Sequence, residues 1–167
     1  KACNADANHQ QQDDSAAHEA TLVALRAREA KPMLQFEDLH AINCVLDAAK
    51  AGDLAGLKKL IEDGSSPDAH VPQYKRTALH WSSEMGHMDV CVYLLEQGAT
   101  VNFQDRTGAS PLHKAAWNGH VEVCGLLLEH GADSSIVDEG GETAMDGANG
   151  VVRRVIMASL GQLDGPV

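Results

Sequence analysis

The chain has 167 residues, of which 44% are hydrophobic and only 4% aromatic, and its formal net charge is −11. This length allows one domain, with a core of small and aliphatic side chains, plus a short tail. The acidic balance argues against binding to a nucleic-acid phosphate backbone, and no run of 18 apolar residues is present that could span a membrane.

The first 36 residues are predicted to be a polar tail, followed by a domain over residues 37–167. Residues 1–15 are rich in Asn, Gln, Asp and Ala, so alone they should be disordered. Ser15 can cap a helix over about residues 16–31, which Pro32 would end. This helix is either a solvated linker or a docking helix.

A first helical unit is predicted over about residues 37–68. Apolar side chains recur at helical spacing in two successive stretches. They are Leu39, Ile42, Val45 and Leu46 in the first and Leu54, Leu57, Leu60 and Ile61 in the second. No helix-capping residue precedes the first stretch, so we interpret this unit as an amino-terminal cap of a larger array. The loop that follows, residues 69–76, is predicted to be one residue longer than its counterpart in the next unit.

Two later stretches repeat one pattern at a fixed offset of 33 residues. Residues 77–87 read TALHWSSEMGH and residues 110–120 read SPLHKAAWNGH. Thr77 and Ser110 are predicted N-caps of a first helix, and a glycine–histidine pair separates it from a second. The second helices should end at Gly98 and Gly131 in left-handed caps. A repeat at this offset indicates a solenoid of stacked units.

A degenerate last copy is predicted over residues 136–162. Thr143 begins the motif again, but Asp146 replaces its histidine, and applying the same offset to Gly119 puts Val152 where glycine is expected. We expect the apolar residues of this copy to pack inward and two arginines to make its outer face polar. They are Val151, Val155, Ile156 and Leu160, and Arg153 and Arg154 respectively.

Residues 44–160 resemble the ankyrin-repeat family. The resemblance lies in the repeat period, the T-P-L-H-x-A motif, the G-H that follows it and a closing segment of the G-A-D-x-N type. The resemblance implies an all-α solenoid of helix-turn-helix units with protruding loop tips. Central repeats would cover about residues 69–102 and 103–135. It also implies a structural role for His80 and His113, which would bridge neighbouring loops, and a structural role is likewise expected for His87 and His120.

The resemblance further implies a concave groove that binds other proteins. Transferred position by position, the candidate contact residues lie on the loop tips and on the exposed side of the first helices. They are Gln73, Tyr74, Arg76, Arg106, Thr107, Glu139 and Glu142 on the tips, and Glu84, Met85, Trp117 and Asn118 on the helices. We expect Trp117 with Met85 to form the desolvated centre, whereas Trp81 is expected to pack.

The loop charges predict a direction for the partner. Lys75, Arg76 and Arg106 are basic, whereas Asp138, Glu139 and Glu142 on the third loop are acidic. A partner along the groove would therefore be acidic toward the amino-terminal repeats and basic toward the carboxyl-terminal ones.

No catalytic constellation and no metal-ligand spacing is recognisable in the sequence. Cys91 and Cys124 fall at the same place in adjacent repeats and are expected to be free, which indicates a reducing, intracellular compartment. Because Lys1 rather than methionine begins the chain, an upstream segment was removed or left out. We expect the cytoplasm, or an organelle interior if that segment was a targeting peptide.

The functional hypothesis is a non-enzymatic protein-interaction module without a cofactor. It would serve as an accessory or scaffold subunit of a multi-subunit complex and use both the groove and the tail. Two alternatives stay open. One is a regulatory or substrate-recruiting part of a larger enzyme whose catalytic domain lies outside this chain, and the other is a metal-dependent enzyme that uses the histidines.

Overall fold

The computed structural model describes residues 36–161. Its helices within that range are α2 (Phe36–Ala51), α3 (Leu54–Glu62), α4 (Ala78–Met85), α5 (Met88–Glu96), α6 (Pro111–Asn118), α7 (Val121–Glu129) and α8 (Gly150–Ser159). The described part holds no named strand, only isolated bridges between His70 and Thr77 and between Val137 and Thr143. The predicted helix over residues 16–31 lies outside the described residues, as does nearly all of the predicted tail, and the boundary at residue 36 stays a prediction.

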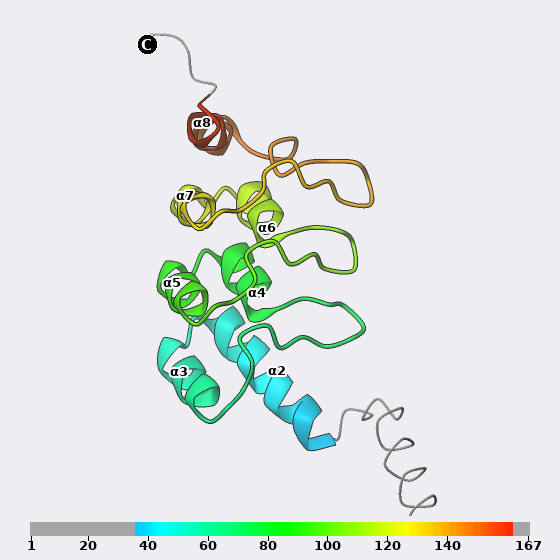
Figure 1. The fold of residues 1–167 in the computed structure, drawn as a ribbon, viewed down its shortest axis with the longest axis vertical. Coiled ribbons are helices and arrows are strands. Elements are labelled where there is room, and N and C mark those ends of the chain that lie inside the picture. The colour runs from blue at the N-terminus through cyan, green and yellow to red at the C-terminus, as the bar shows by residue number, and fades with distance from the viewer. Residues whose placement is uncertain (1–35, 162–167) are drawn as a thin grey trace, which may run out of the picture. The chain divides into compact units, whose positions relative to one another are not determined.

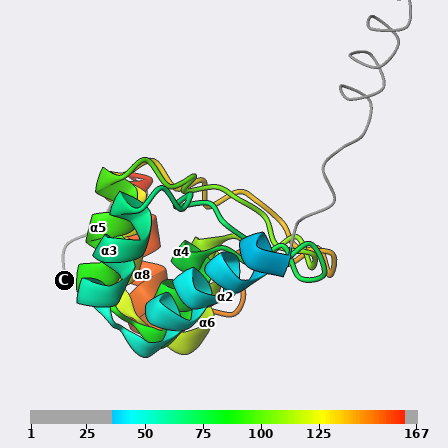
Figure 2. The ribbon, with the colours of Figure 1, turned by 90° about the horizontal axis from the view of Figure 1, so that it is seen from below.

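The helices of this part stack in two layers. Helices α2, α4 and α6 lie side by side in one layer, and α3, α5, α7 and α8 form the other (Figures 1 and 2). Helix α4 packs on both α2 and α6, and α7 packs on both α5 and α8. Long loops between the helical pairs project to one side (Figure 1). This arrangement is the predicted all-α solenoid with protruding loop tips.

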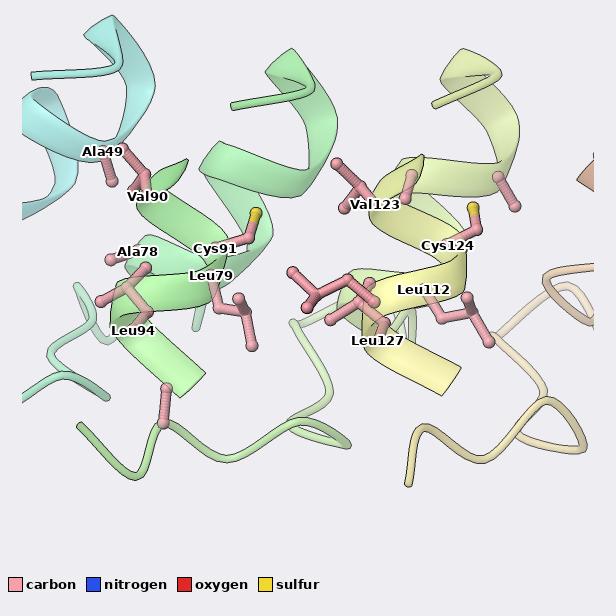
Figure 3. Close-up of a cluster of buried hydrophobic side chains, with 14 of the residues drawn as sticks. Ala49, Ala78, Leu79, Val90, Cys91, Leu94, Leu112, Val123, Cys124 and Leu127 are labelled. Atoms are coloured by element: carbon pink, nitrogen blue, oxygen red, sulfur yellow. The ribbon is translucent and has the colours of Figure 1, made fainter. Parts of the chain in front are cut away.

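The core repeats from one unit to the next. Leu79 and Val90 of one unit are buried, as are Leu112 and Val123 of the following one, and Figure 3 shows their side chains alternating along the stack. Cys91 and Cys124 occupy equivalent places (Figure 3) and both are free and buried, as predicted. Burial raises the pKa of the Cys91 thiol and raises that of Cys124 to about 12, so neither thiol is ionised near neutral pH.

The predicted capping unit forms from α2 and α3. Val45, Leu46 and Leu57 are buried in the common core, and the other predicted apolar residues that pack against it are partly buried, namely Ile42, Leu54, Leu60 and Ile61. The side chain of Asp53 caps α3 by accepting from the backbone N–H of Gly56 at 2.9 Å. The unit therefore extends the core of the repeats toward the amino terminus.

The last unit departs from the expected alignment. Residues 144–147 form a turn instead of a first helix. Helix α8 begins at Gly150, whereas the repeat offset applied to the start of α7 at Val121 predicts a start at Arg154. Asn149 therefore caps α8 at the place where His120 caps α7. The fixed offset aligned Val152 with Gly119, but the observed start of α8 aligns it with the buried Val123.

This earlier start changes which face of α8 is buried. Val152 and Ile156 are fully buried and Val155 partly so, whereas Val151 and Leu160 are 54% and 46% exposed. The expectation that Val151 and Leu160 pack inward was wrong, because the lost helical turn moves the register of α8. Arg153 and Arg154 are exposed, as predicted.

Candidate protein-interaction surface

Two buried histidines join neighbouring loops. The backbone N–H of Thr77 donates to Nδ1 of His80 at 3.2 Å, so the neutral ring carries its hydrogen on Nε2, which donates to the carbonyl oxygen of Ala109 at 3.1 Å. His113 repeats this arrangement with the N–H of Ser110 and the carbonyl oxygen of Glu142, each at 3.2 Å. The predicted structural role of both histidines is confirmed.

A second pair of histidines ties each helical pair to the one before it. Nε2 of His87 donates to the carbonyl oxygen of Lys50 at 3.1 Å, and Nε2 of His120 donates to that of Glu84 at 3.0 Å. Each imidazole lies over a glycine at the end of the preceding first helix, Gly52 or Gly86, whose φ angles are 74° and 78°. Asn149 covers Gly119 in the same way. These contacts fix the stacking of the helices that carry the candidate surface.

We expect stability to fall as the pH drops below the ordinary pKa of histidine. Burial lowers the pKa of His80 from 6.5 to about 4, and burial also lowers the pKa of His113. A proton on Nδ1 would oppose the N–H of Thr77, so the unfolded chain binds that proton more readily. The contribution of neutral His80 to the free energy of unfolding is therefore complete above about pH 6.5 and is lost as the pH falls toward 4. His80 alone accounts for a loss of about 2 kcal/mol by roughly pH 5.

Urea unfolding of the full chain at several pH values measures this loss. His80→Gln should flatten the dependence between roughly pH 7 and pH 5, whereas His130→Gln, at an exposed position, should leave it steep. An unchanged slope in the His80 variant would show that this imidazole accepts a proton without disturbing the loops.

The loop tips are tied to one another by backbone hydrogen bonds. The N–H of Arg106 donates to the carbonyl oxygen of Tyr74 at 3.0 Å, and the N–H of Glu139 donates to that of Thr107 at 2.9 Å. The first loop bridges His70 to Thr77, one residue more than the bridge from Val137 to Thr143, which agrees with the predicted longer first loop. Six of the predicted contact residues are exposed on these loops: Gln73, Tyr74, Arg106, Thr107, Glu139 and Glu142.

A charged network links the first and second loops to α4 and α6. Nη1 of Arg76 lies 2.9 Å from Oε2 of Glu84, and its Nε lies 3.3 Å from Oδ2 of Asp105. Nζ of Lys114 lies 3.0 Å from the same Asp105 oxygen, and these last two side chains are only 6% and 2% exposed. Arg76 is therefore paired with Glu84 and Asp105 and does not offer the uncompensated loop charge that the sequence suggested.

The Asp105 carboxylate is held in its charged form. Burial would raise its pKa, but hydrogen bonds from Thr107 and Lys114 and the lysine charge outweigh burial and lower the pKa to about 2. Oδ1 also accepts the backbone N–H groups of Thr107 and Ala109, at 2.8 and 3.2 Å. Asp105 thus shapes the second loop and fixes Lys114 beneath it.

Two hollows open beside this network, and both are lined by Tyr74, Arg76 and Trp81. The remaining lining residues of the first are Asn43, Leu46, Asp47, Lys50 and Val71. Those of the second are Asp105, Arg106 and Thr107. We call the surface made by these two hollows the double hollow. Four predicted contact residues meet there: Tyr74, Arg76, Arg106 and Thr107.

Sequence reasoning missed Trp81 and Lys50 as members of this surface. Trp81 packs partly buried against the core, as expected, but it also lines both hollows, with Nζ of Lys50 and Cζ of Arg76 at 4.9 and 4.8 Å from its ring centre. The available signal was the large aromatic side chain at a position that the next repeat fills with Lys114. Lys50 gave no such signal, because it reaches Trp81 across a repeat boundary.

Trp117 lines neither hollow. Its ring meets His113 edge to face at 5.5 Å between centroids and has Nζ of Lys114 at 5.2 Å. The indole also fills the space beside Gly147, where any side chain would overlap it. Trp117 remains 36% exposed and Met85 41%, while the amide of Asn118 donates to the carbonyl oxygen of Lys114 at 2.8 Å. All three residues are exposed, but the role of Trp117 with Met85 as the centre of a contact stays a prediction.

Within residues 36–161, no group of three or more His, Cys, Asp or Glu side chains is placed to hold a metal ion. Of the helices described, none is both long and apolar enough to cross a bilayer.

Comparison with known proteins establishes the family. A family model described as ankyrin repeats (3 copies) matches residues 45–138, more than half of the chain. The chain belongs to the ankyrin-repeat family. Ankyrin repeats are a non-catalytic protein-interaction fold, so this ankyrin-repeat chain carries a protein–protein interaction module.

Three similar proteins show the extent of the likeness. The 26S proteasome non-ATPase regulatory subunit 10 of Homo sapiens is 39% identical over 67 residues, 40% of this chain and 30% of that protein. Ankyrin repeat domain-containing protein 39 of Homo sapiens is 43% identical over 72 residues, 41% of this chain and 37% of that protein. Serine/threonine-protein kinase VIK of Arabidopsis thaliana is 44% identical over 69 residues, 41% of this chain and 16% of the kinase. The chain thus matches well under half the length of each relative.

Proposed function

We propose that this chain is a non-enzymatic accessory or scaffold subunit that binds another protein on the side of its loops, in a multi-subunit assembly. The observation that carries the proposal is the exposed, preformed surface around Tyr74, whose side chain is 65% exposed. Its backbone is held by the next loop through the 3.0 Å bond from Arg106. An aromatic side chain on a fixed loop contributes contact area with little loss of conformational entropy.

The regulatory proteasome subunit among the relatives supports membership of a complex. The three cysteines that the structure describes are free, which supports a reducing compartment inside the cell. We also propose that residues 1–36 add a second contact, as the sequence suggested.

Crosslinking in the native setting tests this proposal. A photoreactive residue at Tyr74 in the full chain should crosslink to one partner, identified by mass spectrometry, whereas the same group at Lys58 should not. Lys58 is also exposed but lies on α3, in the layer that α3 forms with α5, α7 and α8 (Figure 2). Equal crosslinking from both positions would refute a surface centred on the loops.

Substitution of the same residue gives the energetic counterpart. Tyr74→Ala should weaken partner binding by about 2 kcal/mol, because a central aromatic contact is lost, while thermal unfolding of the free chain should change little. Lys58→Ala serves as the matched exposed control. Deletion of residues 1–36 measures the contribution of the tail, and binding that survives Tyr74→Ala but not this deletion would assign recognition to the tail.

A second candidate is a substrate-recruiting or regulatory part of a larger enzyme. The likeness to a stretch amounting to 16% of a serine/threonine-protein kinase favours it, since ankyrin arrays can be appended to catalytic domains. A natural reading frame that ends at Val167 and begins shortly before Lys1 would eliminate this candidate.

A further inference from the structure

The double hollow combines apolar walls with an exposed cation in each of its two hollows. Leu46, Val71, Tyr74 and Trp81 supply the apolar surface. Lys50 of α2 lines the first hollow, with its Nζ 4.9 Å from the Trp81 ring centre, and Arg106 of the second loop lines the second hollow. Trp81 and Tyr74 lie on the surface that the two hollows share, so a bound segment could cross both hollows and meet a cation on either side.

The walls are fixed before any partner arrives. Arg76 is held from two directions by Glu84 and Asp105, and its guanidinium lies 4.8 Å from the Trp81 ring centre. The main chain of Tyr74 is bonded to the second loop. Binding there need not order the Arg76 side chain or the backbone that carries Tyr74, which lowers the entropic cost of association.

The charge balance favours a negative ligand. Within residues 36–161, Arg76 and Asp105 take part in ion pairs, whereas neither Lys50 nor Arg106 does. Both are exposed. The exposed Asp47 is the one further carboxylate of the lining, so the lining carries an excess of cations. This local excess stands out on a chain whose formal charge is −11, and it would attract carboxylates.

We propose that the double hollow is the docking site for a partner segment in which one large apolar side chain is flanked on both sides by Asp or Glu. The apolar side chain would pack on Trp81 and Tyr74, and the flanking carboxylates would reach Lys50 and Arg106. This inference rests on the proposed function and names the chemistry of its ligand. It places the centre of recognition at Trp81 and Tyr74 and not at Trp117 and Met85.

Synthetic peptides test the ligand class on the full chain. The probe is a fluorescein-labelled 12-residue peptide with one Phe between two Glu pairs. One matched peptide replaces the glutamates by Lys, another replaces Phe by Ala, and a single-stranded oligonucleotide of equal length is the third comparator. Fluorescence anisotropy should show binding of the acidic Phe peptide at least about 10-fold tighter than binding of any comparator.

Substitutions then locate the binding. The double variant Lys50→Glu with Arg106→Glu should weaken binding of the acidic peptide at least about 10-fold and strengthen binding of the Lys peptide. Trp81→Phe, which keeps an aromatic ring packed against the core, should weaken binding of the acidic peptide several-fold. Lys58→Glu should leave the affinity unchanged. Thermal unfolding of each variant shows that it is folded.

Three results would overturn the ligand class: equal affinity for acidic and basic peptides, preference for the oligonucleotide, or insensitivity to the Lys50 and Arg106 reversal. If Tyr74 still crosslinks to the native partner in that case, the proposed function stands and only its ligand chemistry is wrong. Loss of that crosslink as well would refute both.

Discussion

Asp105→Asn is expected to lower the free energy of unfolding by about 3 to 5 kcal/mol. The substitution keeps an acceptor oxygen for Thr107 but removes the charge that faces Lys114, whose ammonium is 3.0 Å away and only 6% exposed. A buried cation without its counter-ion is strongly unfavourable, and Arg76, which contacts the same Asp105 oxygen, adds to the repulsion. Urea unfolding monitored by circular dichroism measures the change.

Asp138→Asn is the matched control. Asp138 holds the place in the third loop that Asp105 holds in the second, and its Oδ1 accepts the N–H groups of Gly140 and Glu142 at 2.8 and 2.9 Å. It forms no ion pair in the part of the chain that the structure describes, so we expect a loss of about 1 kcal/mol. Adding Lys114→Met to Asp105→Asn should recover much of the stability. Equal losses at Asp105 and Asp138 would show that the ion pairs contribute nothing.

The fold was predictable because its signals are local. The capping residues Thr77 and Ser110 and the terminating glycines are each recognised from a few neighbouring residues. The repeat period follows from comparing two such short stretches. The helices begin and end close to those signals. The error in the last unit arose where the period itself changes, because a deleted helical turn cannot be seen by counting forward from Gly119.

The candidate surface was predictable only in part, for a different physical reason. Exposure of the loop tips follows from the repeat, and Tyr74 and Arg106 were identified from it. The charge network was not predicted, because Arg76, Asp105 and Lys114 meet through the folding of two repeats onto each other. The packing of Trp81 was predicted correctly, but its place in the hollows was not, since these exist only when α2 and the first two loops are in place.

Gly86→Ala is expected to cost about 3 kcal/mol, more than an alanine normally costs at a helix end. Gly86 has φ of 78°, a left-handed conformation that costs about 1 kcal/mol for a residue with a side chain. A Cβ atom there would come 2.6 Å from Nδ1 of His120. That ring cannot move away without stretching its 3.0 Å bond to the carbonyl oxygen of Glu84, which adds the cost of a strained contact and a lost hydrogen bond.

A double-mutant cycle separates the two terms. Gly131→Ala is the control for the backbone alone, because Gly131 has φ of 84° and no atom within 4 Å of the added Cβ, so about 1 kcal/mol is expected. In a His120→Ala background, Gly86→Ala should also fall to about 1 kcal/mol, since the ring that opposes the methyl group is gone. Urea unfolding of the four variants of the cycle gives the coupling between positions 86 and 120. A coupling near zero would mean that the histidine adjusts freely, and that the stacking of α4 on α6 does not depend on the imidazole lying over the glycine.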